Sequence, residues 1–300
     1  MKNILVTGGT VFVSKYVAEY FLNKGNNVYV LNRNTKPQVD GVHLIEGDRH
    51  NLGDKLKKYN FDIVLDITAY TKEDVEDLIN ALNEVNQYIF ISSSAVYPET
   101  LPQPFKEEQE GGANSIWGDY GVNKLEAEKY LLKNVPQAYI LRPPYLYGPM
   151  ENVYRAPFIF DCANEDRTFY IPKDGTMSLQ FFHVEDLCKF IEIILNKQPE
   201  NHIFNVGNKD IVDINEWVSL CYKVAGKGLR TVNVDESHNQ RSYFCFHDYS
   251  YVLDVSKQNE LLPNTKPLID GLKEEYDWYM NNQELVNKKA YLDYINEKII

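Results

Sequence analysis

Short apolar runs alternate with longer amphipathic segments along the first half of the chain. The runs are rich in β-branched and aromatic residues and show little polar alternation, which is typical of strands covered on both faces of a parallel sheet. The expected strands are Asn3–Val6, Asn27–Leu31, His43–Ile45, Ile63–Ile67, Tyr88–Ile91, Tyr139–Leu141 and Ile203–Val206. The expected helices between them are Phe12–Asn23, Lys72–Asn83 and Tyr120–Leu132. This alternation predicts a doubly wound α/β fold with a parallel sheet.

The regular alternation weakens after Pro149, where helical patterns dominate. The helices expected there are Ile214–Ala225, Leu268–Met280 and Gln283–Lys298. We therefore expect one domain over residues 1–150, to which residues 183–207 return as a helix and a last strand, and a smaller, mainly helical lobe over residues 151–300. The segment Pro98–Gly118 is expected to be a long surface loop beside the sheet edge, where loops often bind or gate ligands. Asp119 is expected to cap the helix that follows this loop.

Composition narrows the classes of function. Of the 300 residues 44% are hydrophobic, enough for a large core, and the formal net charge is −12. This charge gives no electrostatic footprint for nucleic acid or an anionic membrane, because neutralising phosphates takes clustered Lys and Arg. The four cysteines lie far apart, so no disulfide framework and no metal site are expected. No apolar run approaches the ~18 residues that span a bilayer, so we expect a cytoplasmic protein with no membrane partner.

The segment TGGTVFVS, from Thr7 to Ser14, predicts a turn that binds a diphosphate. A strand, a Gly-Gly turn and a helix start bring free backbone N–H groups and the positive end of a helix dipole together. Val11 and Ser14 stand where such turns usually carry glycine, so Val11 is acceptable only if its side chain points away from the ligand and its φ is helical. The expected cofactor contacts of the turn are Gly8, Gly9, Thr10, Val11, Phe12 and Val13. A plain strand, turn and helix without a ligand is the alternative.

The ends of the next strands carry further candidate cofactor contacts. Asn32 stands where an NAD enzyme would place a ribose-binding carboxylate, and Arg33 follows it. A guanidinium suits a 2′-phosphate and no acid is present to repel one, so the pair favours NADP over NAD unless Arg33 is a solvated surface residue. The same edge carries Asp48 and Arg49 after the third strand, where an adenine could bind, and Ala69 and Tyr70 after the fourth. Each of these could instead be ordinary turn chemistry.

The strongest catalytic signal is SSSAVY at Ser92–Tyr97 followed by YGVNK at Tyr120–Lys124. A tyrosine and a lysine four residues apart share one helix face, so the ammonium can lower the pKa of the phenol toward neutrality. Such a phenol is a usable base, and a serine at a strand end can hydrogen-bond the reacting oxygen. The same spacing recurs at Tyr20–Lys24 and Tyr294–Lys298, but neither pair follows a strand that ends in serines.

Taken together, these motifs are similar to those of the extended short-chain dehydrogenase/reductase superfamily. Within it the chain resembles the NAD-dependent epimerase/dehydratase family and its branch of chloroplast stem-loop-binding proteins. The resemblance runs from Lys2 to about Tyr279 and is carried by TGGTVFVS, EGDRHNLGDKL, DIVLDITAYTKEDV, FISSSAVY, YGVNKLEAE, LRPPYLYGP, QFFHVEDL and FNVGN. It implies a dinucleotide-binding Rossmann domain over residues 1–150, a substrate-binding lobe over residues 151–300, and NADP or NAD as cofactor.

The resemblance also implies roles for individual residues. Tyr120 would be the general acid/base, and Lys124 would bind the nicotinamide ribose and tune Tyr120. Ser93 would be the catalytic serine, with Ser94 as the neighbouring alternative. The other implied contacts are Ser92, Pro143, Pro144 and Tyr145 with the cofactor, and Ser94 and Tyr147 with the substrate.

Departures from the family pattern concern the substrate. Many nucleotide-sugar epimerases have an Arg-Asp pair ahead of the HV motif, whose Arg holds the substrate diphosphate, but Leu179 and Gln180 occupy these places here. Losing such a clamp costs affinity. Arg142, Arg155 and Arg241 are the remaining candidate phosphate partners, and each has an alternative as a structural or surface residue. We interpret His183 as a structural hydrogen-bonding residue.

The leading hypothesis is therefore an NADP- or NAD-dependent epimerase/dehydratase that acts on a sugar nucleotide. A reductase of another carbonyl substrate would use the same three residues, so the motif does not separate the two. A non-catalytic cofactor-sensing or RNA-binding relative is a further alternative, against which the acidic charge and the complete Ser-Tyr-Lys set argue. The helices at 72–83 and 120–132 resemble those that form the family's dimer interface, so a homodimer is expected.

Overall fold

The larger lobe is organised around a parallel sheet of seven strands in the order β11-β6-β5-β4-β1-β2-β3. The computed structural model describes residues 1–300. The strands are β1 (Asn3–Thr7), β2 (Asn27–Asn32), β3 (His43–Glu46), β4 (Ile63–Asp66), β5 (Gln87–Ile91), β6 (Tyr139–Arg142) and β11 (Ile203–Asn205). The order of the strands reverses between β1 and β4. In doubly wound folds, ligands bind at the carboxyl ends of the strands beside such a reversal.

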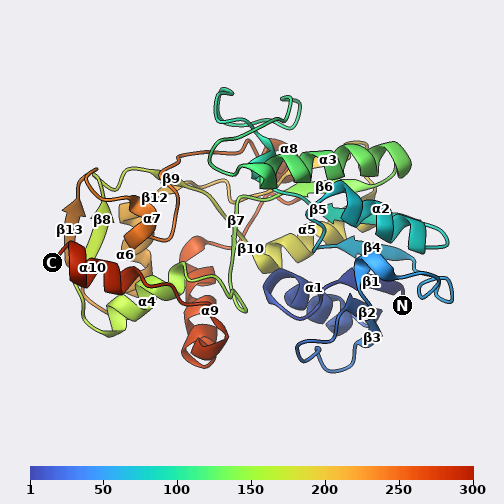
Figure 1. Cartoon of the computed structure of the whole chain (residues 1–300), viewed down its shortest axis with the longest axis horizontal. Helices are drawn as coiled ribbons and strands as arrows, with labels where there is room; N and C mark the ends of the chain where they lie inside the picture. Colours follow the sequence, from blue (N-terminus) through green and yellow to red (C-terminus); the bar gives the residue numbers. More distant parts are fainter.

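Helices cover both faces of this sheet (Figure 1). One face packs against α1 (Phe12–Asn23) and α5 (Val184–Lys197), where Phe21 and Leu187 are buried. The other face packs against α2 (Lys72–Ala81) and α3 (Asp119–Asn134), where Leu78 and Leu131 are buried. Burial on both faces explains why the strands lack polar alternation.

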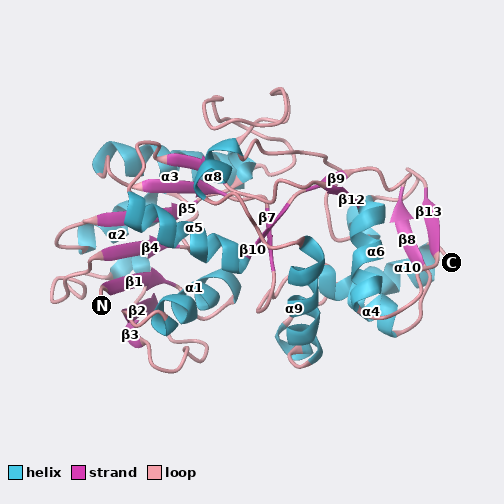
Figure 2. Cartoon of the chain, turned by 180° about the vertical axis from the view of Figure 1, so that it is seen from behind, coloured by secondary structure: helices cyan, strands magenta, loops and turns pink.

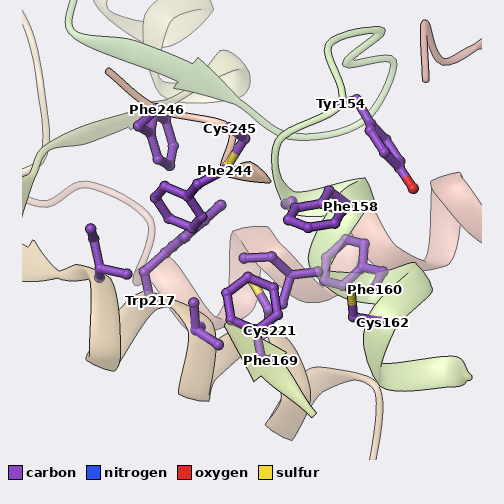
Figure 3. Close-up of a cluster of buried hydrophobic side chains, with 14 of the residues drawn as sticks. Tyr154, Phe158, Phe160, Cys162, Phe169, Trp217, Cys221, Phe244, Cys245 and Phe246 are labelled. Atoms are coloured by element: carbon purple, nitrogen blue, oxygen red, sulfur yellow. The ribbon is translucent and has the colours of Figure 1, made fainter. Parts of the chain in front are cut away.

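The smaller lobe has an aromatic core (Figure 3). Its helices are α4 (Ala156–Asn164), α6 (Ile214–Val224), α7 (Gln240–Tyr243), α9 (Leu268–Met280) and α10 (Tyr291–Lys298). Beside them β8 (Phe169–Pro172) pairs in parallel with β13 (Thr231–Val234). The ring of Trp217 lies 4.9 Å from that of Phe246 and 5.6 Å from that of Phe181, measured between centroids.

Four short strands and one loop join the lobes. In Figure 2, β7 (Tyr145–Tyr147) with β10 (Phe181–His183), and β9 (Ser178–Leu179) with β12 (Val212–Asp213), lie between the sheet and the smaller lobe. The loop before α3 also crosses to the smaller lobe. There the Trp117 ring packs edge-on against His247 at 5.2 Å, and against Tyr249 and Tyr251. The helix α8 (Ser256–Leu261) makes the reverse crossing and packs on α5 and β11.

The predicted α/β class, parallel sheet and smaller C-terminal lobe are confirmed. Every predicted end of the seven sheet strands lies within one residue of the observed end. Three short 3₁₀ helices complete the fold: η1 (Arg49–Asn51), η2 (Ser94–Val96) and η3 (Gln283–Leu285). No helix combines the length and the apolar character needed to cross a bilayer.

Two predicted helix details are wrong. Asp119 does not cap α3: it is the first residue of the helix, and Gly118 is the N-cap at φ 53°, a conformation that favours glycine. The predicted helix Gln283–Lys298 is split into η3 and α10. The chain between them pairs with another segment instead, because Asn287 N–H donates to the carbonyl of Asn152 at 2.9 Å. This tertiary contact outweighs the local helical pattern.

Candidate active site

A groove follows the carboxyl edge of the sheet at the strand reversal. It consists of two adjoining cavities, of about 490 Å³ and about 370 Å³, which share Gly8, Thr68 and Tyr70 in their walls. The larger cavity is lined by the glycine turn, the strand end that carries Ser93, and the first turns of α3. The smaller cavity is lined by the ends of β2 and β3. We call them the catalytic cavity and the adenosine cavity.

The glycine turn has little room for side chains. Gly8 and Gly9 have φ of 89° and 81°, so both need the left-handed freedom of glycine. A Cβ on Gly8 would lie 2.8 Å from Ser14 Oγ, and a Cβ on Gly9 would lie 2.4 Å from Val30 Cγ1. The carbonyl of Gly8 is fixed from the next strand by Asn32 Nδ2, which donates to it at 2.7 Å.

The two departures from the glycine pattern fit in different ways. Ser14 is buried, and its hydroxyl donates to the carbonyl of Val11 at 2.9 Å, so it fills the contact between helix and strand. The helical φ expected of Val11 is wrong: Val11 is the N-cap of α1 with φ −138°, an extended backbone that a β-branched residue adopts readily. The helix start has no side-chain cap, so its first N–H groups stay available to an anion.

Besides the shared Gly8 and Tyr70, four predicted cofactor contacts line the adenosine cavity: Asn32, Arg33, Asp48 and Arg49. Asp48 accepts the N–H of His50 and so caps η1. Arg49 is committed to the protein, because its Nη2 lies 2.6 Å from Oδ1 of the buried Asp66. Arg33 is exposed and makes no ion pair or side-chain hydrogen bond. Arg33 is therefore the arginine with donors left for a 2′-phosphate, and the NADP preference stays a prediction.

The structure brings Ser93, Tyr120 and Lys124 to one cavity. Lys124 is buried, and its Nζ donates to the carbonyls of Ala69 at 2.7 Å and Ile91 at 2.8 Å. The same Nζ lies 6.0 Å from the centroid of the Tyr120 ring. An ammonium has three N–H donors, so one remains for a ligand hydroxyl or the phenol.

The pKa of Tyr120 moves in the direction opposite to the expected one. Although 39% of Tyr120 is exposed, the cavity walls desolvate its phenol and raise the pKa, while the neighbouring Ser93 hydroxyl acts in the opposite direction. Burial also lowers the pKa of Lys124 to about 8. The ammonium is still mostly charged at pH 7, but two of its N–H donors are held by the carbonyls of Ala69 and Ile91. In the protein alone, Tyr120 is an acid that keeps its proton.

The three consecutive serines have different surroundings. Ser92 lines the catalytic cavity, but its Oγ donates to Glu128, which is paired with the buried Arg142. Ser93 lines the cavity, its Oγ accepts the N–H of Ala95 at 3.1 Å, and its hydroxyl is the neighbour that lowers the pKa of Tyr120. Ser94 is buried and does not line the cavity, so its predicted substrate contact stays a prediction without a place in the cavity wall. The structure therefore favours Ser93 over Ser94.

Two tyrosines that were expected at the ligand are not on the cavity wall. Tyr145 packs against Phe246, with 4.5 Å between ring centroids, and Tyr147 packs against His183 at 5.1 Å. Side chains alternate along a strand, so Leu146, which lies between them in β7, faces the catalytic cavity instead. Pro143 and Pro144 line the cavity as expected. Asn152 of the smaller lobe also lines the cavity, and no sequence motif predicts it there.

The remaining candidates have structural roles or lie elsewhere. Ala69 contributes its carbonyl to Lys124 and its side chain is buried, whereas Tyr70 lines both cavities. Arg142 is buried against Glu128, and Arg241 lines a separate polar cavity of about 430 Å³ in the smaller lobe. His183 Nδ1 accepts the N–H of Glu185, and His183 is the N-cap of α5.

Known proteins are similar to this chain in sequence and in fold. Residues 4–207 match the model of the NAD dependent epimerase/dehydratase family. The chain is 27% identical to the chloroplast stem-loop binding protein of 41 kDa b from Arabidopsis thaliana, over 92% of this chain and 79% of that protein. It is 25% identical to the UDP-glucose 4-epimerase of Corynebacterium glutamicum, over 74% of this chain and 80% of that protein. It spans 48% of a trifunctional UDP-glucose 4,6-dehydratase, epimerase and reductase of Arabidopsis thaliana, to which it is 24% identical.

Solved structures share the fold over nearly the whole chain. One is the UDP-glucose 4-epimerase of Thermotoga maritima with UDP-glucose, with a TM-score of 0.75, 19% identity, and coverage of 94% of this chain and 99% of that one. Another is the dTDP-glucose 4,6-dehydratase of Bacillus anthracis in complex with NAD, with a TM-score of 0.75, 20% identity, and coverage of 95% and 99%.

Proposed function

Because the chain belongs to the NAD-dependent epimerase/dehydratase family, we propose that it is an enzyme that moves a hydride between NADP or NAD and a sugar nucleotide. The observation that carries the proposal is the catalytic cavity, in which the glycine turn, Ser93, Tyr120 and Lys124 meet. The Thermotoga maritima and Bacillus anthracis structures, with UDP-glucose and NAD respectively, support the ligand classes.

The residues present suit a dinucleotide. The glycine turn and the uncapped start of α1 would hold its diphosphate, and the third N–H of Lys124 would reach the nicotinamide ribose. Asn32, Arg33 and Asp48 would surround the adenosine half. When bound, the nicotinamide supplies a hydride donor or acceptor.

Tyr120 and Ser93 act on the reacting oxygen. Because burial raises the pKa of Tyr120, the phenol carries its proton at neutral pH. With a bound nicotinamide as the hydride source, Tyr120 Oη would give that proton to the oxygen of a substrate carbonyl. Ser93 Oγ, which lies beside Tyr120 in the same cavity, would donate a hydrogen bond to the same oxygen. For oxidation of a hydroxyl, Tyr120 must lose its proton, so a positive charge beside the phenol has to offset the effect of burial.

Identification of the cofactor is the first test. The purified protein is denatured, and released nucleotides are identified by mass spectrometry. Release of a retained NADP or NAD supports an epimerase, which returns the hydride to the same substrate, and an exchangeable site supports a reductase. Protein that binds neither dinucleotide, in calorimetry at millimolar ligand, contradicts the proposal.

A second candidate function is RNA binding without catalysis. It is favoured by the similarity to the chloroplast stem-loop binding protein over 92% of the chain. The net charge of −12 opposes it. Filter binding with a stem-loop RNA at moderate salt tests it: tight association that weakens steeply with salt would support RNA binding.

We also propose that the protein is a homodimer that associates through α2 and α3, which pack side by side on one face of the sheet. The outer surface of these helices carries charged side chains, including the ion pairs Lys72–Glu76 and Lys129–Glu126. A dimer of this kind would be polar at its rim. Light scattering coupled to size exclusion tests it, and a stable monomer at micromolar concentration contradicts it.

A further inference from the structure

One arginine of the smaller lobe, Arg155, reaches the catalytic cavity. It is the N-cap residue of α4, after the loop that leaves β7. The other basic residue in the cavity wall is Lys124, and two of its three donors are held by carbonyls. The cavity therefore has one arginine whose role the proposed chemistry does not explain.

The guanidinium of Arg155 is fixed on several sides. Its Nε donates to Glu151 Oε1 at 2.6 Å and its Nη2 donates to the carbonyl of Leu146 at 2.9 Å. The Tyr145 ring lies below it, with the guanidinium carbon 5.5 Å from the ring centroid. Nη1 makes no hydrogen bond within the protein, and 15% of the side chain is exposed. A planar group held in this way keeps the donors of Nη1 in a fixed place, and Arg155 is part of the cavity wall.

Two buried acidic residues lie beside Arg155. Glu151 is buried next to Glu275 of α9, whose Oε2 accepts the N–H of Gly148 at 3.2 Å. Burial and the neighbouring Glu151 raise the pKa of Glu275 well above its ordinary value. This shift favours the uncharged form of Glu275 and so reduces the negative charge that an anion beside Arg155 would meet.

We propose that Arg155 Nη1 binds a phosphate oxygen of the ligand in the catalytic cavity, either from the dinucleotide or from the sugar nucleotide. The identity of the ligand rests on the proposed function. The two positions that depart from the epimerase pattern offer no cation: Leu179 is buried, and Gln180 Nε2 is used by the carbonyls of Asn208 and Leu253. Arg155 supplies the missing positive donor from a different segment.

The test measures binding of three probes by calorimetry: inorganic pyrophosphate, ADP-ribose and UDP. Arg155→Gln is expected to weaken at least one nucleotide probe and pyrophosphate by about tenfold or more, since hydrogen bonds from a cation to phosphate are strong. Arg155→Lys keeps the charge but loses the planar fork, so an intermediate loss is expected. Arg230→Gln is the control, because Arg230 is an exposed arginine paired with Asp166 outside the cavity.

A double variant separates a loss of phosphate binding from a loss of stability. Removing Arg155 alone leaves the buried Glu151 unpaired, which destabilises the fold. Arg155→Gln combined with Glu151→Gln removes both charges, and it is expected to unfold near the wild-type temperature while still losing the phosphate probes.

The outcomes distinguish the source of the phosphate. Weaker binding of ADP-ribose alone assigns the contact to the dinucleotide, and weaker binding of UDP alone assigns it to the substrate. Unchanged affinity for all three probes in the double variant overturns the proposal, as does wild-type protein that does not bind pyrophosphate. Wild-type protein that binds pyrophosphate through Arg155 but neither nucleotide keeps this site and refutes the proposed function.

Discussion

The two walls of the catalytic cavity are built in different ways. The wall from the larger lobe combines the turns that directly follow β1, β4 and β5 with the first turns of α3, which carry Tyr120 and Lys124. The wall from the smaller lobe includes Asn152 and Arg155. The carbonyl of Asn152 accepts from Asn287, and Glu151, the partner of Arg155, is buried beside Glu275 of α9. The chemistry thus resides on a locally encoded wall, and the candidate phosphate contact on a wall that exists only once distant segments have packed.

The hydrophobic cores of the two lobes also differ in how much they depend on segments distant in sequence. The larger lobe has a mainly aliphatic core between a continuous sheet and its helices. The smaller lobe has an aromatic core assembled from separate segments, and its β8 and β13 pair across about 60 residues of sequence. Substitutions can therefore test whether catalysis and stability divide between the lobes as this comparison indicates.

The largest effect is expected at Tyr120. Tyr120→Phe removes only the proton-carrying oxygen, so turnover should fall by about 10²- to 10⁴-fold while dinucleotide affinity stays unchanged. Steady-state kinetics and calorimetry measure the two. Tyr294→Phe, at a chance Tyr-x-x-x-Lys site in α10, should alter neither. Full turnover in Tyr120→Phe would contradict a catalytic role for Tyr120 and for the larger-lobe wall.

The next effect concerns the aromatic core. Trp217 is 1% exposed, so Trp217→Ala should lower the free energy of unfolding by about 3–5 kcal/mol through lost burial and a new cavity. Denaturant titration measures this change. Val232→Ala, at a residue that is 47% exposed in the same lobe, should stay within about 0.5 kcal/mol of wild type. A loss below about 1 kcal/mol at Trp217 would mean that the aromatic core does not support the smaller lobe.

A smaller effect is expected in the glycine turn. Gly8→Ala adds a Cβ at 2.8 Å from Ser14 Oγ and from Thr68 Cγ2, at a φ of 89°. The left-handed backbone alone costs an alanine about 1–2 kcal/mol, and the close contacts add to this and displace the turn from a diphosphate. Gly226→Ala is the matched control, because its φ is also positive but nothing lies within 4 Å of the new Cβ. Denaturant titration measures the free energy of unfolding of both variants. An equal decrease in the two would show that the turn around Gly8 is not crowded.

The smallest effect is a pH dependence at Lys124. Burial lowers its pKa from 10.5 to about 8, so between these values the unfolded chain binds more protons than the folded one. The contribution of Lys124 to stability should therefore rise as pH increases from about 8 to 10.5, and it should be least favourable below pH 8. Thermal unfolding of wild type and Lys124→Met across this range isolates the contribution. A difference that stays constant with pH would contradict the lowered pKa.

The sequence predicted the features that depend on neighbouring residues. Strand ends, the glycine turn and the Tyr120–Lys124 spacing are local, and the structure brings Ser93, Tyr120 and Lys124 to one cavity. The orientation of Tyr145 and Tyr147 was not predictable, since β7 leaves the main sheet and pairs with β10, which turns both rings into the smaller lobe.

The pKa of Tyr120 also depends on more than spacing. The four-residue spacing places Lys124 on the same helix face as Tyr120. The direction of its ammonium, however, is set by the carbonyls of Ala69 and Ile91. These carbonyls belong to β5 and to the turn after β4, so a pattern within one helix does not contain them.

The loop before α3 links the reacting phenol to the other half of the molecule. Trp117 lies three residues before Tyr120, and its indole packs edge-on against the rings of His247, Tyr249 and Tyr251 of the smaller lobe. A ligand that shifts one lobe against the other would therefore change the surroundings of this indole. In a variant without the other two tryptophans, the fluorescence of Trp117 would report such a shift without a label and without turnover.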